Sequence, residues 1–100
     1  MDLTSGIKRI IATGKIEYGT NSTLDHIRSG KAKAVIIAEN TPESFKSDIE
    51  QYSRIAGVPM LVFRGTSLEL GQVCGKPFVI RSIAILNMGD VKIKELLEEQ

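Results

Sequence analysis

The sequence lacks what several common functional classes require. It contains one cysteine, Cys74, among 100 residues, which excludes an internal disulfide and a metal site built from several cysteines. No apolar run approaches the ~20 residues needed to cross a membrane. The first residues show no basic region followed by an apolar stretch, so we expect no signal peptide. These absences predict a reduced, cytoplasmic protein without a membrane anchor.

Sequence signatures of catalysis are also missing. There is no G-x-x-x-x-G-K-[ST] loop, and no G-x-G-x-x-G follows a predicted strand. The single histidine, His26, lies beside Asp25 in a predicted helix, where neighbouring side chains point about 100° apart and form no acid–base dyad. Cys74 has no nearby base to activate it, and we expect it to be buried as a small apolar side chain. We therefore predict no enzyme, no cofactor and no bound metal.

Charge of one sign is likewise not in excess. The chain has 13 Lys and Arg against 12 Asp and Glu, a formal net charge of +1, which argues against a broadly basic coat for nucleic acid. Hydrophobic residues make up 42% and charged residues 25%, as in ordinary globular proteins. At this length, residues 1–100 are expected to form a single domain.

Helical and strand patterns alternate along the chain, separated by glycine. Residues 34–38, Ala-Val-Ile-Ile-Ala, are an apolar run typical of a strand buried on both faces. We predict helices that stop at Gly14, Gly30, Gly57 and Gly75, a C-terminal helix after Gly89 with Ile93, Leu96 and Leu97 inward, and strands at 15–18, 34–38, 59–63 and 78–86. This order predicts a central sheet with helices on both faces, an α/β/α sandwich.

Helix starts carry recognisable caps. Thr20 or Asn21 can cap the second helix. In Asn40-Thr41-Pro42 we expect a loop, a cap and a proline at the first helical position. Thr66 and Glu69 have the spacing of a capping box at the start of the fourth helix.

The loop after the strand 15–18 is a candidate nucleic-acid contact. Backbone N–H groups at the start of a helix favour a phosphate. Gly19 lets a ligand approach the backbone, and the side chain of Asn21 offers donors and an acceptor to a base edge. The alternative is that Thr20 or Asn21 only caps the helix.

Two further segments are expected at the same end of the sheet. Asn40 follows the strand 34–38, and parallel strands bring such loops to one edge. If the last strand runs antiparallel, Lys76 at its start would meet phosphate, while Phe78 and Val79 would face an unstacked base. The alternative for Phe78 is packing in the core. The three loops together predict a compact RNA site.

Five segments that span nearly the whole chain resemble one protein family. They are Thr-Gly-Lys at 13–15, Tyr-Gly-Thr-Asn at 18–21, Ile-Ile-Ala-Glu-Asn at 36–40, Asp-Ile-Glu-Gln-Tyr at 48–52 and Leu-Gly-Gln-Val-Cys-Gly-Lys-Pro-Phe at 70–78. They resemble the archaeal and eukaryotic large-subunit ribosomal protein of the "L-thirty-e" type. That family belongs to the superfamily of kink-turn RNA binders that includes the "L-seven-Ae" proteins.

The resemblance implies a fold, a partner and a site. The implied fold is an α/β/α sandwich with a mixed four-stranded sheet, without catalytic activity. The implied partners are ribosomal RNA, at a kink-turn or similar internal loop, and neighbouring ribosomal proteins, with the free chain monomeric. By position, the implied RNA-binding residues are Gly19, Thr20, Asn21, Asn40, Lys76, Phe78 and Val79. Asn21 departs from the lysine common in eukaryotic members, and Ser22 departs from the glutamate of the guide-RNA branch.

Three functional hypotheses follow. The first is a structural component of the large ribosomal subunit that binds a kink-turn in ribosomal RNA; its close variant is a kink-turn binder in a guide-RNA particle. The second is a small nucleotide-binding domain that uses the same strand-to-helix loops. The third is a protein-interaction domain of the same fold.

Overall fold

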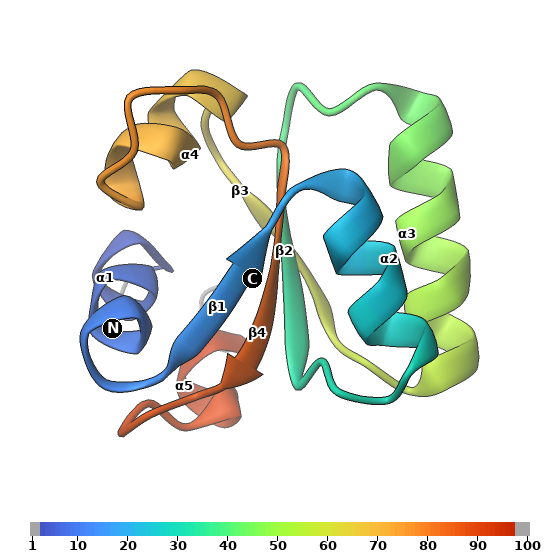
Figure 1. Ribbon diagram of the computed structural model, residues 1–100, viewed down its shortest axis with the longest axis horizontal. Coiled ribbons are helices and arrows are strands. Elements are labelled where there is room, and N and C mark those ends of the chain that lie inside the picture. Colours follow the sequence, from blue (N-terminus) through green and yellow to red (C-terminus); the bar gives the residue numbers. More distant parts are fainter. Residues whose placement is uncertain (1–2, 98–100) are drawn as a thin grey trace.

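A computed structural model describes residues 3–97 and shows helices and strands alternating along the chain (Figure 1). In order, the elements are α1 (Leu3–Thr13), β1 (Lys15–Tyr18), α2 (Thr20–Arg28), β2 (Ala34–Ala38), α3 (Glu43–Ala56), β3 (Met60–Phe63), α4 (Ser67–Val73), β4 (Ser82–Asn87) and α5 (Ile93–Leu97). This is the element order that the glycine-separated patterns predict.

The four strands form one mixed sheet in the order β1-β4-β2-β3. β2 and β3 are parallel, whereas β4 runs antiparallel to both of its neighbours. The carboxyl ends of β1, β2 and β3 therefore lie at the same edge as the start of β4. The predicted mixed four-stranded sheet is confirmed, and the last strand runs antiparallel, which is the condition for its start to lie beside the other two loops.

Helices cover both faces of the sheet, which makes three layers (Figure 1). α1, α4 and α5 pack on one face, and α2 and α3 pack on the other. All five residues of β2 are buried, because successive side chains point to opposite covered faces. Ile36 contributes to the core under α1, and Ile37 to the core under α2; truncating either to alanine should cost about 2–5 kcal/mol.

The N-caps of α2 and α3 differ from the predicted ones. The N-cap of α2 is Gly19, with φ of 105°, rather than Thr20 or Asn21. Its carbonyl oxygen accepts from both the backbone N–H and the hydroxyl of Thr23. The N-cap of α3 is Pro42, one residue later than predicted, because the Thr41 hydroxyl donates to the Arg81 carbonyl instead of capping.

The last strand is shorter at its start than predicted. It begins at Ser82 rather than Phe78, although Phe78-Val79-Ile80 is an apolar run. The reason is that this segment bonds to α4 and not to a strand: the Ile80 N–H donates to the Ser67 carbonyl at 2.9 Å. Residues 78–81 therefore form an irregular segment across α4.

Other sequence signals are confirmed. Gly57 ends α3 in the left-handed conformation, with φ of 71°, which suits a residue without Cβ. Thr66 and Glu69 form the predicted capping box at the start of α4. Leu96 is fully buried, whereas the side chain of Leu97 lies outside what the structure describes.

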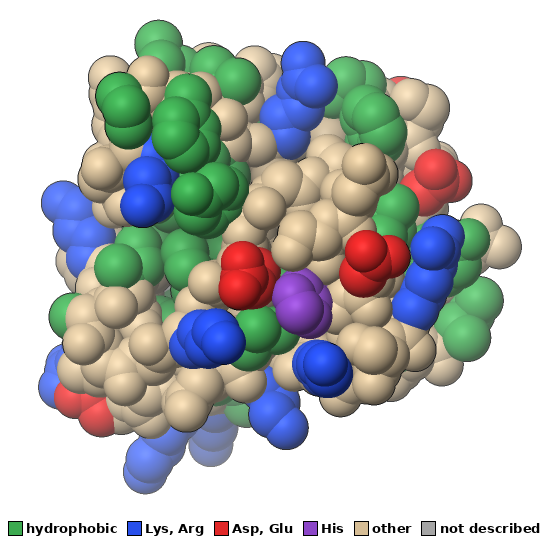
Figure 2. Space-filling view, in the orientation of Figure 1, with side chains coloured by type: hydrophobic (Ala, Val, Ile, Leu, Met, Phe, Trp, Pro, Cys, Tyr) green, Lys and Arg blue, Asp and Glu red, His purple; other side chains and the backbone are tan. Residues whose placement is uncertain are grey.

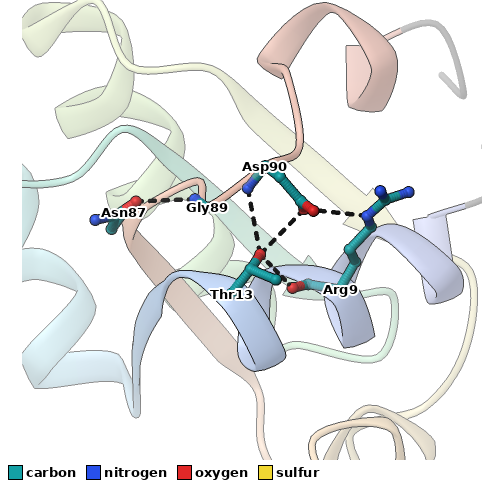
Figure 3. A network of polar contacts seen from close by, with 5 residues as sticks. All are labelled: Arg9, Thr13, Asn87, Gly89 and Asp90. Atoms are coloured by element: carbon teal, nitrogen blue, oxygen red, sulfur yellow. Dashed lines mark hydrogen bonds and ion pairs between the residues drawn. The ribbon is translucent and has the colours of Figure 1, made fainter.

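At the end of the sheet where β4 ends, a polar network joins the turn after β4 to α1 (Figure 3). The Arg9 Nε donates to an Asp90 carboxylate oxygen at 3.0 Å, and the Asp90 N–H donates to the Thr13 hydroxyl at 3.2 Å. The Gly89 N–H donates to the Asn87 side chain at 2.8 Å. This network holds the turn after β4 against the end of α1.

Candidate nucleic-acid interface

The three predicted segments meet at the edge of the sheet where β4 begins. The Gly19 N–H donates to the Ser82 carbonyl at 3.1 Å, which joins the loop after β1 to the start of β4. The Ala38 N–H donates to the Arg81 carbonyl at 2.9 Å, which joins the end of β2 to the same segment. The structure thus brings the loop 19–21, the loop after β2 and the segment 76–79 together, as the sequence predicts.

An exposed aromatic pair dominates this edge. Phe78 is 44% exposed and Tyr18 38% exposed, and their ring centroids lie 5.6 Å apart, in the range of favourable aromatic contacts. Val79 beside them is 53% exposed. Core packing, the alternative for Phe78, therefore does not occur. Figure 2 shows hydrophobic side chains gathered at the upper left, over the segment between α4 and β4.

Lys76 places a positive charge against the aromatic pair. Its Nζ lies 5.6 Å from the centre of the Tyr18 ring, within the range of a cation–π contact. The backbone N–H of Lys76, three residues after α4, donates to the Gly71 carbonyl at 2.9 Å, which holds the Lys76 backbone against the end of that helix. An ammonium group beside two exposed rings suits a ligand that offers both a phosphate and a flat base.

An open pocket of about 240 Å³ lies next to the aromatic pair. It is lined by Tyr18, Gly19, Thr20, Val79, Ile80 and Arg81. Tyr18 and Arg81 are residues that the sequence analysis missed. The available signal was position: Tyr18 directly precedes the loop glycine, and Arg81 directly follows the apolar run in the last segment.

The start of α2 points its free backbone donors at this edge. Among the described residues, no side chain caps this helix, so the N–H groups of its first turn have no acceptor within the helix. They carry the positive end of the helix dipole. Asn21, in that first turn, is exposed. Capping, the alternative role for Thr20 and Asn21, is therefore wrong, and the Asn21 amide has the accessibility that a ligand contact requires.

Asn40 has a structural role that the sequence did not indicate. Its side-chain oxygen accepts from the Ser67 N–H at 2.8 Å, and its amide nitrogen lies 3.4 Å from the Ser67 hydroxyl oxygen. These bonds join the loop after β2 to the first residue of α4. A planar amide keeps a second N–H and a second lone pair for another partner. The Asn40 side chain could therefore contact a base edge while it stays bonded to Ser67.

Cys74 is buried, as predicted, at 7% exposure. Burial raises the pKa of its thiol to about 11, although the positive charge of Lys76 acts in the opposite direction. The thiol is therefore neutral near pH 7 and lacks the thiolate character of a nucleophilic cysteine. It packs among the apolar side chains of the core under α1 and α4.

Residues 3–97 hold neither a cluster of metal-ligating side chains nor a helix that could span a membrane. No three His, Cys, Asp or Glu side chains there are grouped so as to hold a metal ion. None of the helices in this part of the chain is both long and apolar enough to span a membrane.

Comparisons with known proteins relate the whole chain to one family. Residues 1–95 match the model of the "Ribosomal protein L7Ae/L30e/S12e/Gadd45 family". Proteins named "Large ribosomal subunit protein eL30" are similar over nearly their full length. The one from Methanosphaera stadtmanae is 42% identical over 98% of this chain and 100% of its own. The one from Methanothermobacter thermautotrophicus is 40% identical over 97% of this chain and 99% of its own.

A more distant relative of the same name gives the same result. The protein from Methanocaldococcus jannaschii is 35% identical over 100% of this chain and 91% of its own. Family match and relatives agree with the resemblance carried by the sequence segments, above all by residues 70–78. The chain belongs to the ribosomal protein L7Ae/L30e/S12e/Gadd45 family, and within it to the archaeal type of L30e protein.

Proposed function

We propose that this chain is a structural, non-enzymatic component of the large ribosomal subunit that binds ribosomal RNA at a kink-turn or similar internal loop. Family membership and the names of the relatives support the ribosomal role. The observation that carries the RNA site is the exposed Tyr18–Phe78 pair next to the uncapped start of α2. A flat apolar surface beside free backbone donors matches an unstacked base and its phosphate.

Three sets of protein groups make the proposed contacts with the RNA. Free backbone N–H groups in the first turn of α2, at Thr20 and Asn21, bind a phosphate oxygen, with Lys76 as a second positive charge. Gly19, whose own N–H donates to the Ser82 carbonyl, lets the RNA approach the backbone. Phe78 and Val79 cover an unstacked base. Asn21 hydrogen-bonds to a base edge, and Asn40 contributes its remaining hydrogen-bonding capacity. Because these groups fit a bent RNA, binding selects the bent form from an ensemble of straighter ones.

The rest of the proposal concerns the state of the protein. Residues 1–100 form a single RNA-binding domain, which is monomeric when free and contacts neighbouring ribosomal proteins once assembled. It acts in the cytoplasm as part of the ribosome, without a cofactor.

A gel-shift titration tests the proposal. A kink-turn RNA and a fully paired RNA of equal length are titrated with wild type, Asn21→Ala and Phe78→Ala at about 150 mM salt, where non-specific binding is weak. Matched controls are Gln51→Ala and Ile55→Ala, which remove an exposed amide and an exposed apolar side chain on α3. Loss of one stacked base should weaken binding by about 1–3 kcal/mol.

The RNA-binding proposal and a small-ligand site predict different results. The proposal requires selective binding of the bent RNA, weakened by Asn21→Ala and Phe78→Ala and unchanged by the two controls. Equal binding of both RNAs, or indifference to both site substitutions, would leave the fold intact and refute the proposed function. A thermal shift produced by a nucleotide, without RNA selectivity, would instead favour a small-ligand site.

A further inference from the structure

Three lysines gather at the end of the sheet opposite to the Tyr18–Phe78 pair. Lys15 starts β1 and pairs with Asn87, near the end of β4. Lys33 directly precedes β2, and its N–H donates to the Ile85 carbonyl of the same strand at 2.7 Å. β1 and β2 flank β4, so the two backbones lie about 10 Å apart, which is two strand spacings.

The third lysine lies on the turn that leads into β2. Lys31 and Lys33 flank Ala32, which is 6% exposed and belongs to the core under α2. The N–H groups of Lys31 and Ala32 both donate to the His26 carbonyl, at 3.0 and 3.1 Å. With Ala32 anchored inward, the two lysines on either side are held outward on a fixed backbone. In Figure 1 the start of β1 and the turn before β2 lie at the lower end of the sheet. Figure 2, in the same orientation, shows Lys and Arg side chains along that end.

These lysine charges are not neutralised by nearby carboxylates. In the described part of the chain, Lys15, Lys31 and Lys33 take part in no salt bridge, and all three are exposed. The carboxylates around them are largely engaged elsewhere: Asp90 pairs with Arg9 at 3.0 Å, and Asp25 lies 3.9 Å from Arg28.

Glu17, two residues after Lys15 on β1, is half-buried. Lys15, Lys31 and Lys33 are exposed and in no salt bridge among the described residues. This cluster therefore has a local surplus although the whole chain is almost neutral, at +1.

The chemistry of this surface fits a phosphate backbone and not a base. Lysine is a point charge on a flexible stem and binds phosphate without the planar geometry that selects a base edge. Within residues 3–97, none of the exposed large hydrophobic side chains belongs to the turn 29–33 or to the start of β1, so the turn and the strand start offer no apolar surface to an unstacked base.

We propose that Lys15, Lys31 and Lys33 form a second RNA contact, which binds the phosphate backbone of an RNA segment separate from the one at Phe78. β4 spans six residues between the two ends of the sheet, about 20 Å, so one compact protein bridges two RNA segments. The choice of RNA as the partner rests on the proposed function, but no residue of the first site contributes to the second.

The test uses the full chain and a fluorescent RNA duplex of about 20 base pairs, bound over a range of salt from about 20 to 150 mM KCl. The protein is first saturated with unlabelled kink-turn RNA, and duplex binding is followed by fluorescence anisotropy. Replacing Lys15, Lys31 and Lys33 by alanine should lower duplex affinity at least about tenfold at 50 mM KCl. The slope of log affinity against log salt should fall by about 2 to 3, which is nearly one per lost phosphate contact.

Two matched variants separate local contact from net charge. Replacing Lys8, Lys92 and Lys94 by alanine removes the same charge from exposed positions of α1 and the segment around α5, and duplex binding should persist. Arginine at positions 15, 31 and 33 should preserve it as well, because the charges remain. Wild-type affinity in the first alanine triple, or an equal loss in the control triple, would overturn the proposal.

Separate measurements test the second RNA contact and the proposed function, so either can be refuted without the other. Kink-turn binding is titrated in parallel for every variant, and it should be retained by the alanine triple. Loss of kink-turn selectivity with retained duplex binding would refute only the first site. Unchanged thermal unfolding of the triple would show that the lysines act on RNA and not on folding.

Discussion

Gly71 lies in α4 directly beneath the segment that carries Phe78. A Cβ at this position would overlap the carbonyl oxygen of Phe78. The same segment is attached to α4 at both ends, by the Lys76 N–H on the Gly71 carbonyl and by the Ile80 N–H on the Ser67 carbonyl, each at 2.9 Å. Gly71→Ala should therefore push Phe78 away from α4 and from its contact with Tyr18.

The expected loss of stability combines three effects. Overpacking costs about 1–3 kcal/mol, and one weakened backbone hydrogen bond adds about 1 kcal/mol. Alanine in a helix offsets about 0.5–1 kcal/mol relative to glycine. We expect the free energy of unfolding of Gly71→Ala to fall by about 1–3 kcal/mol, measured by urea unfolding. Gln72→Ala, an exposed neighbour in α4, is the control and should stay near wild type.

RNA binding tests whether Gly71 acts through Phe78. Phe78→Ala should cost about 1–3 kcal/mol of stacking, or about five- to 150-fold in affinity. Introduced alone into the wild-type protein, Gly71→Ala should reduce RNA affinity by a comparable amount. Added to Phe78→Ala, it should reduce RNA affinity little further, since both changes remove the same contact. Wild-type stability and RNA affinity in Gly71→Ala, or losses that simply add in the double variant, would refute the reasoning.

Three further predictions concern folding and reactivity. Thr23→Val removes a buried hydroxyl that lies 3.1 Å from the Ser82 hydroxyl and donates to the Gly19 carbonyl. The Gly19 carbonyl keeps its bond from the Thr23 N–H, but the buried Ser82 hydroxyl loses this partner, which should lower the free energy of unfolding by about 1–3 kcal/mol; unchanged urea unfolding would contradict this. The Arg9 side chain, more than other contacts, lowers the pKa of Asp90 below its ordinary 3.8. Asp90 therefore contributes stability that is present above this ordinary value and is lost as pH falls through the lower folded value. Asp90→Asn should flatten the fall of the urea midpoint below about pH 4, and an unchanged acid limb would count against the ion pair. Cys74, with a pKa of about 11, should react with iodoacetamide at pH 8 far more slowly in the folded protein than in urea; equal rates would show that the thiol is not protected.

Local chemistry made much of the fold predictable. The run at 34–38 is apolar at every position, and a strand with this pattern is stable only when both faces are covered, as β2 is. Gly57 and the Thr66–Glu69 pair act within a single turn of helix, so their effects do not depend on distant residues. The loop at 19–21 was predictable because a strand followed by glycine and a polar residue marks the start of a helix.

What escaped prediction depends on residues far apart in the chain. Phe78-Val79-Ile80 resembles a strand, but its backbone bonds to α4, where Gly71 leaves the necessary room. The pairing of Tyr18 with Phe78 joins residues 60 positions apart in sequence, and no local pattern indicates it.

The sequence by itself determined the element order, the sandwich class and which loops are expected to bind RNA, because helix stops, caps and buried runs are local properties. Only the tertiary structure decided which side chains face solvent at the two ends of the sheet. Strand order brings Lys15 and Lys33 to either side of β4, and it brings Tyr18 next to Phe78. Both arrangements follow from hydrogen bonding between distant segments, which sequence spacing does not encode.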